Sequence, residues 1–394
     1  MTSVAALERL GTSSALARCV GDPGTFLDTV WGRRAVVHPG VEPSGFQDLL
    51  SFDDVDRILS TTSLRTPSFR LVQAGKQIPE TAYTRAGTTG SRPVTGMADP
   101  SRIAELFRGG ATIVLQGLHR YSEPVSRFVR DLELELGHAC QVNAYVTPRG
   151  AQGLPLHDDP HDVFVLQAFG RKSWEVHAAP AEAERDPITA TVASGDAIYM
   201  PTGTPHAAAT QETISGHLTV GVHVSSWRDV LARAWKRVER VPALAQPLPA
   251  GWSQDPEGFS RALAERLDRA RAELANVGAA ELAEEHAIAF LSTRAPLLRG
   301  VLVDQQELEG IDDRSALERR PGSVCEIRTR NERLLVLLGD RRLEMPLWLE
   351  PAMRRIAAQP SFVVADLSDV LPHPPSRLVL VRRLVREGLL RPVR

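Results

Sequence analysis

The strongest constraint on the fold is a series of short, strand-like segments that fills residues 111–225. The six segments are rich in apolar residues and read ATIVLQGL, CQVNAYVTP, DVFVLQAFG, KSWEVHA, DAIYMPTG and GHLTVGVHVS. Turn residues separate them, and one helix-like stretch, PVSRFVRDLELELG, lies among them. This spacing is typical of a β-sandwich or small barrel. Strand–helix alternation and a glycine-rich phosphate loop are both missing, which argues against a parallel nucleotide-binding sheet.

The segments on either side of this β-rich part contain more helical residue patterns. Residues 1–110 mix helical and strand-like patterns, and the polar stretch TRAGTTGSRPVTGMADPS at 84–101 is expected to be a loop. Residues 226–300 read as helical, and 301–394 combine a strand–turn–strand, LLVLLGDRRLEMP, with two helices. We therefore expect three domains, with the first extending over 1–225.

One helical segment, SRALAERLDRARAELANVG, carries an apolar stripe at helical spacing. The stripe either faces the core of its own domain or pairs with a second copy of the chain. Its members are Leu263, Leu267, Ala270 and Leu274.

Charge and cysteine content limit the partners and the compartment. The formal net charge of −2 gives no global attraction to nucleic acid or to a membrane. The three cysteines are odd in number and far apart, which indicates a reduced compartment. The first residues lack the features of a signal peptide, and no apolar run approaches the roughly 20 residues that cross a bilayer. We expect a soluble, cytoplasmic protein.

The C-terminal end is basic. DNA binding is one interpretation, although an arginine-rich helix is more often a solvated face, and we do not expect nucleic acid as a partner. The arginines concerned are Arg377, Arg382, Arg383, Arg386, Arg391 and Arg394.

The stretch LPLHDDPHDVFVLQ, residues 154–167, contains the candidate metal ligands. Side chains two apart on a strand point the same way, so His157 and Asp159 can reach one metal ion while Asp158 points away. Pro160 interrupts strand pairing directly afterwards. A His-X-Asp pair supplies two ligands of a facial triad, which leaves three coordination sites of Fe(II) open.

The third ligand is expected from a later strand. His206 follows the strand-like GDAIYMP and a turn that can direct it back inside. His217 and His223 lie on one face of the next strand and are interpreted as structural or substrate-side residues.

Lys172 is the candidate partner of a co-substrate carboxylate. Strand alternation places it on the same face as Trp174, and a lysine inside a barrel is costly without an anion. The distal carboxylate of 2-oxoglutarate would supply that anion. Tyr145, on one face with Asn143, could donate a hydrogen bond to the same carboxylate.

These motifs resemble those of the JmjC-type ribosomal oxygenases. The resemblance implies a mainly β catalytic domain with the double-stranded β-helix (cupin) fold over 1–225. It also implies a helical dimerisation region over 226–300, a winged-helix domain over 301–394, and a homodimer. The matching residues are His157, Asp159, Val163, Phe164, Gln167, Gly170, Lys172, Trp174, Gly195, Asp196, Tyr199, Pro201, Gly203 and His206.

By the same resemblance, His157, Asp159 and His206 bind Fe(II), and Lys172, assisted by Tyr145, holds 2-oxoglutarate, with O2 as co-substrate. The implied activity is hydroxylation of an arginine or histidine side chain in a ribosomal or other protein or peptide. Asp158, His161 and Asp162 are expected on the rim of the site or behind the ligands, and an acidic rim would attract such a basic substrate. Residues expected to contact the substrate or to support the ligands are Asn143, His161, Asp162, Ser215 and His217.

Other functions remain open from the sequence. A hydroxylase that modifies a natural-product peptide would use the same chemistry, and so would an N-demethylase. A non-catalytic cupin with a winged-helix binding module, or a transcription factor, would not turn over 2-oxoglutarate.

Overall fold

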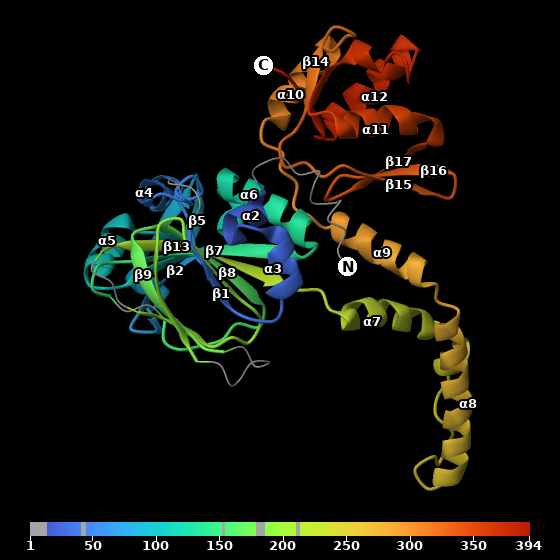
Figure 1. The fold of residues 1–394 in the computed structure, drawn as a ribbon, viewed down its shortest axis with the longest axis horizontal. Coiled ribbons are helices and arrows are strands. Elements are labelled where there is room, and N and C mark those ends of the chain that lie inside the picture. The colour runs from blue at the N-terminus through green and yellow to red at the C-terminus, as the bar shows by residue number, and fades with distance from the viewer. Residues whose placement is uncertain (1–13, 41–44, 152–153, 179–185, 210–212) are drawn as a thin grey trace. The chain divides into compact units, whose positions relative to one another are not determined.

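The protein consists of two compact units, Met1–Val224 and Ser225–Arg394 (Figure 1). This computed structural model describes residues 14–40, 45–151, 154–178, 186–209 and 213–394. Within these residues, no helix has both the length and the apolar character needed to cross a membrane.

The first unit is built on two antiparallel sheets, as expected from its short strand-like segments. The larger sheet has the strand order β1-β11-β8-β13-β7-β6-β2-β3, and the smaller has the order β10-β9-β12. The strands of the larger sheet are β1 (Val36–His38), β2 (Phe69–Gln73), β3 (Lys76–Gln77), β6 (Thr112–Leu115), β7 (Ala139–Thr147), β8 (Asp162–Phe169), β11 (Ala197–Met200) and β13 (Ser215–His223). Those of the smaller sheet are β9 (Arg171–Val176), β10 (Ile188–Ala193) and β12 (His206–Ala209).

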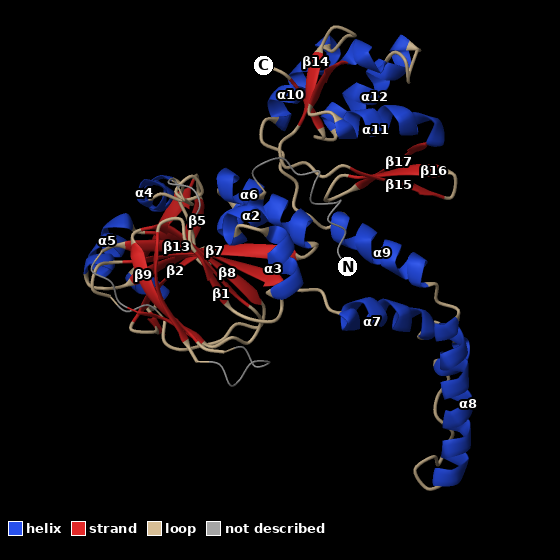
Figure 2. Ribbon diagram, in the orientation of Figure 1, coloured by secondary structure: helices blue, strands red, loops and turns tan. Residues whose placement is uncertain are grey.

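Helices cover one face of the large sheet and leave the other face for the site. Figure 2 shows α2 (Ala15–Val20), α3 (Pro23–Thr29) and α6 (Glu123–Leu136) gathered beside this sheet. In β7 the buried, apolar positions alternate with more polar ones. Val142 and Val146 join the helix-covered core. Alternation therefore directs Gln141, Asn143 and Tyr145 to the opposite face, toward the small sheet. Two further helices, α4 (Phe52–Thr61) and α5 (Pro100–Arg108), belong to this unit.

One prediction for this unit is wrong. The polar stretch at 84–101 is not a loop but contains a hairpin of β4 (Thr84–Thr89) and β5 (Arg92–Ala98). Gly90, at φ 59°, lies in the two-residue turn between Thr89 and Arg92, where a left-handed residue suits the twist of the strands. Most of the hairpin is exposed, so its strands lack the apolar alternation by which a half-buried strand is recognised.

The second unit joins the helical and the α+β parts of the sequence. Ile288 of α9 packs against Leu335 and Leu337 of β16, so the helices share a small core with the strands. The expected strand–turn–strand is present as β16 and β17. The helices are α7 (Trp227–Val238), α8 (Pro256–Ala275), α9 (Ala279–Leu291), α10 (Val301–Glu307), α11 (Glu350–Ala358) and α12 (Pro374–Arg386). The strands are β14 (Ala316–Arg319), β15 (Glu326–Arg330), β16 (Arg333–Leu337), β17 (Arg342–Pro346), β18 (Ser361–Val363) and β19 (Leu390–Pro392).

The C-terminal arginines do not form the solvated basic face expected from the sequence. Arg377 is buried and forms a two-pronged ion pair with Asp313 at 2.9 and 3.1 Å. Four others are also bound within this unit, so little of their charge is free for a polyanion. Their partners are two backbone carbonyls for Arg382, Glu387 for Arg383, Glu318 for Arg391, and Asp304 with Glu307 for Arg394.

Candidate metal and co-substrate site

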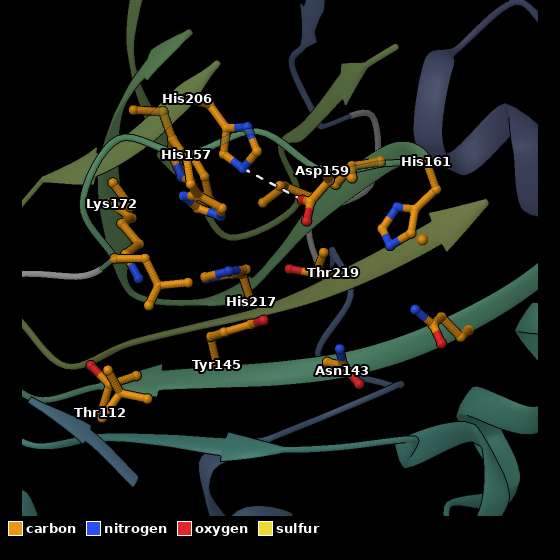
Figure 3. A pocket seen from close by; sticks show the side chains of 18 residues that line it. Thr112, Asn143, Tyr145, His157, Asp159, His161, Lys172, His206, His217 and Thr219 are labelled. Carbon is orange, nitrogen blue, oxygen red and sulfur yellow. Dashed lines mark ion pairs between the residues drawn. The ribbon is translucent and has the colours of Figure 1, made fainter. Parts of the chain in front are cut away.

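A pocket lies between the two sheets of the first unit (Figure 3). Inward-facing side chains of β7, β8 and β13 line it from the large sheet, and those of β9 and β12 from the small one. The period of two along each strand selects these residues, because every second side chain points into the space between the sheets.

Backbone pairing brings together the three predicted metal ligands. The amide N–H of each of His157 and His206 donates to the carbonyl of the other, at 3.1 and 2.8 Å. The carbonyl of Asp159 accepts from the amide of Gly203 at 2.9 Å, which ties the same two segments together. One potential ligand atom from each of the three side chains lies within 4.8 Å of the others. His206 Nε2 and Asp159 Oδ2 are 3.7 Å apart.

The local backbone differs from the continuous strand assumed for this motif. His157 forms only an isolated bridge, and β8 begins at Asp162, after Pro160. Proline has no N–H to donate to a ladder, so the strand cannot extend through it. The alternation argument still separates these side chains, because Asp158 is exposed while His157 and Asp159 line the pocket.

Hydrogen bonds orient both histidines for metal binding. Nδ1 of His157 lies 2.8 Å from the carbonyl oxygen of Pro155, and Nδ1 of His206 lies 2.9 Å from that of Thr204. A carbonyl only accepts, so each Nδ1 carries the hydrogen and each Nε2 keeps a lone pair for a metal. Burial lowers the pKa of His206 and favours the neutral, ligating form. Two imidazoles and one carboxylate suit Fe(II) with open coordination positions.

Lys172 is a buried cation at one end of the pocket. It is 3 % exposed, and its Nζ donates to Thr147 Oγ1 at 3.1 Å. Burial lowers the pKa of Lys172 to about 8. In the part of the chain that the structure describes, no carboxylate forms an ion pair with it. Because a buried charge is costly without a counter-charge, this end of the pocket fits a ligand carboxylate.

Two polar atoms near Lys172 also lack a hydrogen-bond partner among the described residues. Trp174 Nε1 and His217 Nδ1 are buried without a hydrogen bond to any described residue. Burial, followed by the charge of Lys172, lowers the pKa of His217 well below its usual value, so this imidazole is neutral. Buried polar groups are normally paired, which indicates that a polar ligand completes this end of the pocket.

Tyr145 stands between this end and the rest of the pocket. Its ring stacks on His217, with centroids 5.2 Å apart and an interplanar angle of 6°. Burial raises the pKa of the Tyr145 hydroxyl, and the positive charge of Arg70 opposes part of this increase. Figure 3 shows this hydroxyl directed away from Lys172, on the side of Thr219. That Tyr145 assists Lys172 stays a prediction, and Thr147 is the hydroxyl that contacts the lysine.

The remaining predicted residues lie in different places. Asn143, His161 and His217 line the pocket. Ser215 is buried outside the pocket lining, where it accepts a hydrogen bond from Gln167 Nε2 at 2.9 Å. We infer that Ser215 fixes the strands rather than a ligand.

Asp162 does not form part of an acidic rim. Its carboxylate is 4 % exposed and accepts hydrogen bonds from the Tyr199 hydroxyl and from the amide and hydroxyl of Thr202. Its side chain follows the alternation of β8 away from the pocket. Asp162 thereby holds the segment that leads to His206.

Sequence reasoning missed several polar residues that line the pocket or contact Lys172 beside it. Thr147 and Gln141 share the alternation of Tyr145 on β7, so the same pattern could have identified them. The other polar residues missed are Thr112 and Thr219, which also line the pocket.

Comparison with known proteins places this site in a recognised domain. The JmjC domain profile matches residues 120–230. The bifunctional lysine-specific demethylase and histidyl-hydroxylase NO66 of Branchiostoma floridae is 28% identical over 322 residues, 81% of this chain and 48% of that protein. Human ribosomal oxygenase 1 is 28% identical over 227 residues, 53% of this chain and 34% of that protein. The chain thus spans about half or less of the length of these curated relatives.

Solved structures show the same fold over most of the chain. The ribosomal oxygenase YcfD of Escherichia coli aligns with a TM-score of 0.54 and 18% identity, over 95% of this chain and 99% of that one. A structure of the same E. coli protein in complex with cobalt and 2-oxoglutarate aligns with a TM-score of 0.54 and 18% identity, over 93% of this chain and 97% of that one.

Proposed function

From the JmjC domain at residues 120–230, we propose that this chain is an Fe(II)- and 2-oxoglutarate-dependent oxygenase. It hydroxylates an amino-acid side chain of a ribosomal or other protein. The observation that carries the proposal is one pocket that holds both the His157–Asp159–His206 triad and the buried cation of Lys172, which has no carboxylate partner among the described residues. The names of the relatives, ribosomal oxygenase and histidyl-hydroxylase, support the substrate class.

Residues in different parts of the pocket have different proposed roles, in binding the metal, the co-substrate or the substrate. Iron and 2-oxoglutarate, when bound, supply oxidation of an unactivated C–H bond coupled to decarboxylation of the 2-oxo acid to succinate. The two histidines present Nε2 lone pairs, and Asp159 presents a carboxylate. Lys172 and Thr147 hold the distal carboxylate of the co-substrate, and His217 and Trp174 border it with polar atoms. Asn143, Tyr145 and Thr219 remain for the substrate side chain.

The test is turnover with a natural protein mixture. The iron-loaded chain is incubated with 2-oxoglutarate, O2 and ribosomes from a strain that lacks the protein. Succinate formation is measured, together with a peptide that gains one oxygen by mass spectrometry. Release of formaldehyde instead would identify N-demethylation by the same chemistry. Absence of succinate with every protein or peptide mixture would leave a non-catalytic binding protein.

The rate should depend on pH through Lys172. Its pKa is lowered to about 8, so the lysine is charged at pH 7 and loses its proton as the pH rises through 8. The neutral amine no longer attracts the carboxylate, and the facing His217 is neutral throughout this range. We expect kcat/KM for 2-oxoglutarate to fall about tenfold per pH unit above that pKa. In Lys172→Arg the guanidinium stays charged, and this decline should disappear. An identical decline in both proteins would assign it to another group.

We also propose that the chain is a homodimer that pairs through α7 and α8. The side chains of Trp227, Leu231 and Trp235, four residues apart on α7, are 83, 62 and 49 % exposed. Leu263 and Leu267 on α8 are each 45 % exposed. Exposed apolar surface of this extent is a feature of interaction sites, which supports the pairing interpretation of the leucine stripe.

Charged residues on this face should dissociate the dimer. We expect Leu231→Asp with Leu267→Asp to halve the mass measured by light scattering, because a buried aspartate without a partner is costly. Val379→Asp, at an apolar position of α12 that is 71 % exposed, is the matched control and should leave the mass unchanged. A wild-type protein that is already monomeric at micromolar concentration would refute the dimer.

For the C-terminal part, we propose a winged helix over 301–394 that does not bind nucleic acid. The sheet of β15, β16 and β17 supports the wing, and the helices α11 and α12 pack in the same core. The internal pairing of its arginines supports the absence of a DNA partner. The three cysteines are free thiols, which supports a reducing, cytoplasmic location.

A further inference from the structure

The stretch of chain around the β4–β5 hairpin is strongly basic, although the whole chain is not. Residues 62–98 contain four arginines, one lysine and a single carboxylate, so their formal charge is +4 in a chain whose net charge is −2. The structure describes all of these residues, and they belong to the first unit. Such a local excess of one sign indicates a charged partner that the net charge of the whole chain does not reveal.

The pairing of three segments places two of these arginines on one face of the hairpin. Arg65 forms an isolated antiparallel bridge with Met97 of β5, and Met97 pairs on its other side with Arg85 of β4. Directly opposed residues in antiparallel strands point to the same face. The position of the Met97 side chain agrees, because a Cβ at Gly87, two residues after Arg85, would lie 3.1 Å from its Sδ. Arg65 and Arg85 therefore lie two strand spacings apart, about 10 Å, with Met97 between them.

A bulge in β5 brings a third arginine, Arg92, to the same face. The register shifts between Arg85 and Gly87, where two residues of β4 oppose three of β5. Such an extra residue changes the direction of the side chains that follow it. Arg92 pairs with Thr89, which lies four residues after Arg85 on the strand without the extra residue. Arg92 thus shares the face of Arg85, and the two residues are roughly 13 Å apart along the strands.

These three residues, which we call the basic face, have no carboxylate partner within the described parts of the chain. Arg65, Arg85 and Arg92 are all exposed, and none of them forms an ion pair with a described residue. Nε of Arg65 donates to the carbonyl of Thr95 at 2.9 Å, which ties this side chain to β5 and leaves its terminal nitrogens for another acceptor. The single carboxylate of the stretch is Glu80, which is exposed in the short helix η1 (Glu80–Ala82) before the hairpin.

The uniform sign of the basic face fits a partner that is negatively charged throughout. Protein surfaces carry charges of both signs, so an acidic patch on another folded protein would also bring cations to this face. A nucleic-acid backbone carries a negative charge at every phosphate, and a guanidinium binds a phosphate through two parallel hydrogen bonds. Separations of about 10 and 13 Å allow the three guanidinium groups to contact different phosphates.

We propose that the β4–β5 hairpin is an RNA-docking element, in which Arg65, Arg85 and Arg92 bind backbone phosphates without reading the base sequence. The choice of RNA rests on the proposed function, because a protein substrate in a ribosome is surrounded by RNA. The contact with phosphates rests on the basic face itself.

Binding of an RNA duplex measures this contact without turnover. The full chain is titrated into a fluorescein-labelled RNA duplex of mixed sequence, and fluorescence anisotropy gives the Kd between about 50 and 200 mM salt. Three phosphate contacts predict a slope of about −2.7 in a plot of the logarithm of the association constant against that of the salt concentration, which is roughly a 40-fold loss of affinity over this range. A duplex of different sequence should bind with the same Kd to within about threefold, because phosphate contacts carry no sequence information.

Variants connect the binding to the basic face. Arg85→Gln alone should reduce the magnitude of the salt slope by about one, and glutamine at all three positions should weaken binding at least about tenfold at the lowest salt concentration. The matched control removes three charges from exposed positions elsewhere on the same unit and should keep the slope. It combines Arg57→Gln, Arg127→Gln and Arg171→Gln. The Kd of each Mn(II)-loaded variant for 2-oxoglutarate checks that the unit remains folded.

The outcomes separate this proposal from the proposed function. No binding of the duplex, an unchanged slope in the triple variant of the basic face, or an equal loss in the control would overturn RNA docking. Binding of poly-glutamate or of a DNA duplex at least about tenfold more tightly than RNA would overturn RNA as the partner. If RNA binds through the basic face but the iron-loaded protein forms no succinate with any protein mixture, the proposed function fails and RNA docking stands. Succinate formation without RNA binding would do the reverse.

Discussion

Replacing Asp159 with alanine should reduce succinate formation to background and weaken metal binding by more than about a hundredfold. Loss of a residue that merely orients a ligand costs roughly 10–100-fold, so loss of a ligand should cost more. The variant retains two imidazoles, which hold a divalent ion without the carboxylate that completes the triad. Succinate is measured by NMR under O2, and metal affinity is measured separately by titration of Mn(II).

A neighbouring aspartate provides the control for this experiment. Asp158 is exposed and lies outside the pocket lining, so Asp158→Ala changes the charge of the same segment without removing a ligand. Its succinate formation and Mn(II) affinity should match those of the wild type. Turnover of Asp159→Ala at the wild-type rate would eliminate the triad as the metal site.

Replacing Lys172 with methionine should raise the KM and Kd for 2-oxoglutarate by about a hundredfold or more. Removing one partner of a buried, hydrogen-bonded charge pair costs about 2–5 kcal/mol, which spans roughly 30-fold to several thousandfold. Methionine fills the apolar space of the lysine stem, so the loss reports the charge. Calorimetry of the Mn(II)-loaded protein gives the Kd, and succinate formation at varied 2-oxoglutarate gives the KM.

Two substitutions show that the effect comes from the buried cation. Lys172→Arg retains a positive charge at the same position and should recover much of the affinity. Arg171 is the exposed neighbour on β9, so Arg171→Met removes a charge outside the pocket and should leave both constants unchanged. An unchanged Kd in Lys172→Met would show that the co-substrate carboxylate is held elsewhere.

The ligand triad shows what a local sequence pattern can predict and what it cannot. Strand alternation within one motif selected His157 and Asp159 over Asp158, and the structure places them beside His206. The motif did not show that Pro160 stops the strand and that a bridge between His157 and His206 replaces it. Alternation still held because the His-X-Asp unit alone decides which side chains share a face.

The strands could be predicted where partial burial produces an alternation of apolar and polar residues in the sequence. The half-buried strands β7 and β9 alternate visibly, and their inner faces were identified correctly. The β4–β5 hairpin left no such trace because solvent reaches most of it, and its threonines and glycines look like those of a loop. For Asp162 the local sequence was misleading. Its position among the candidate ligands suggested a residue on the rim of the site, but its carboxylate is buried and accepts hydrogen bonds from Tyr199 and Thr202.

The sequence by itself determined the antiparallel β character of the first unit, the three candidate metal ligands and the cation beside them. These features depend on a period of two and on the spacing of a few residues, which are local properties of the chain. The tertiary structure decided that Thr147 contacts Lys172, that the ring of Tyr145 stacks on His217, and that five of the six C-terminal arginines are bound within their own unit. Each of these contacts depends on strand register or packing between distant segments, which no local pattern records.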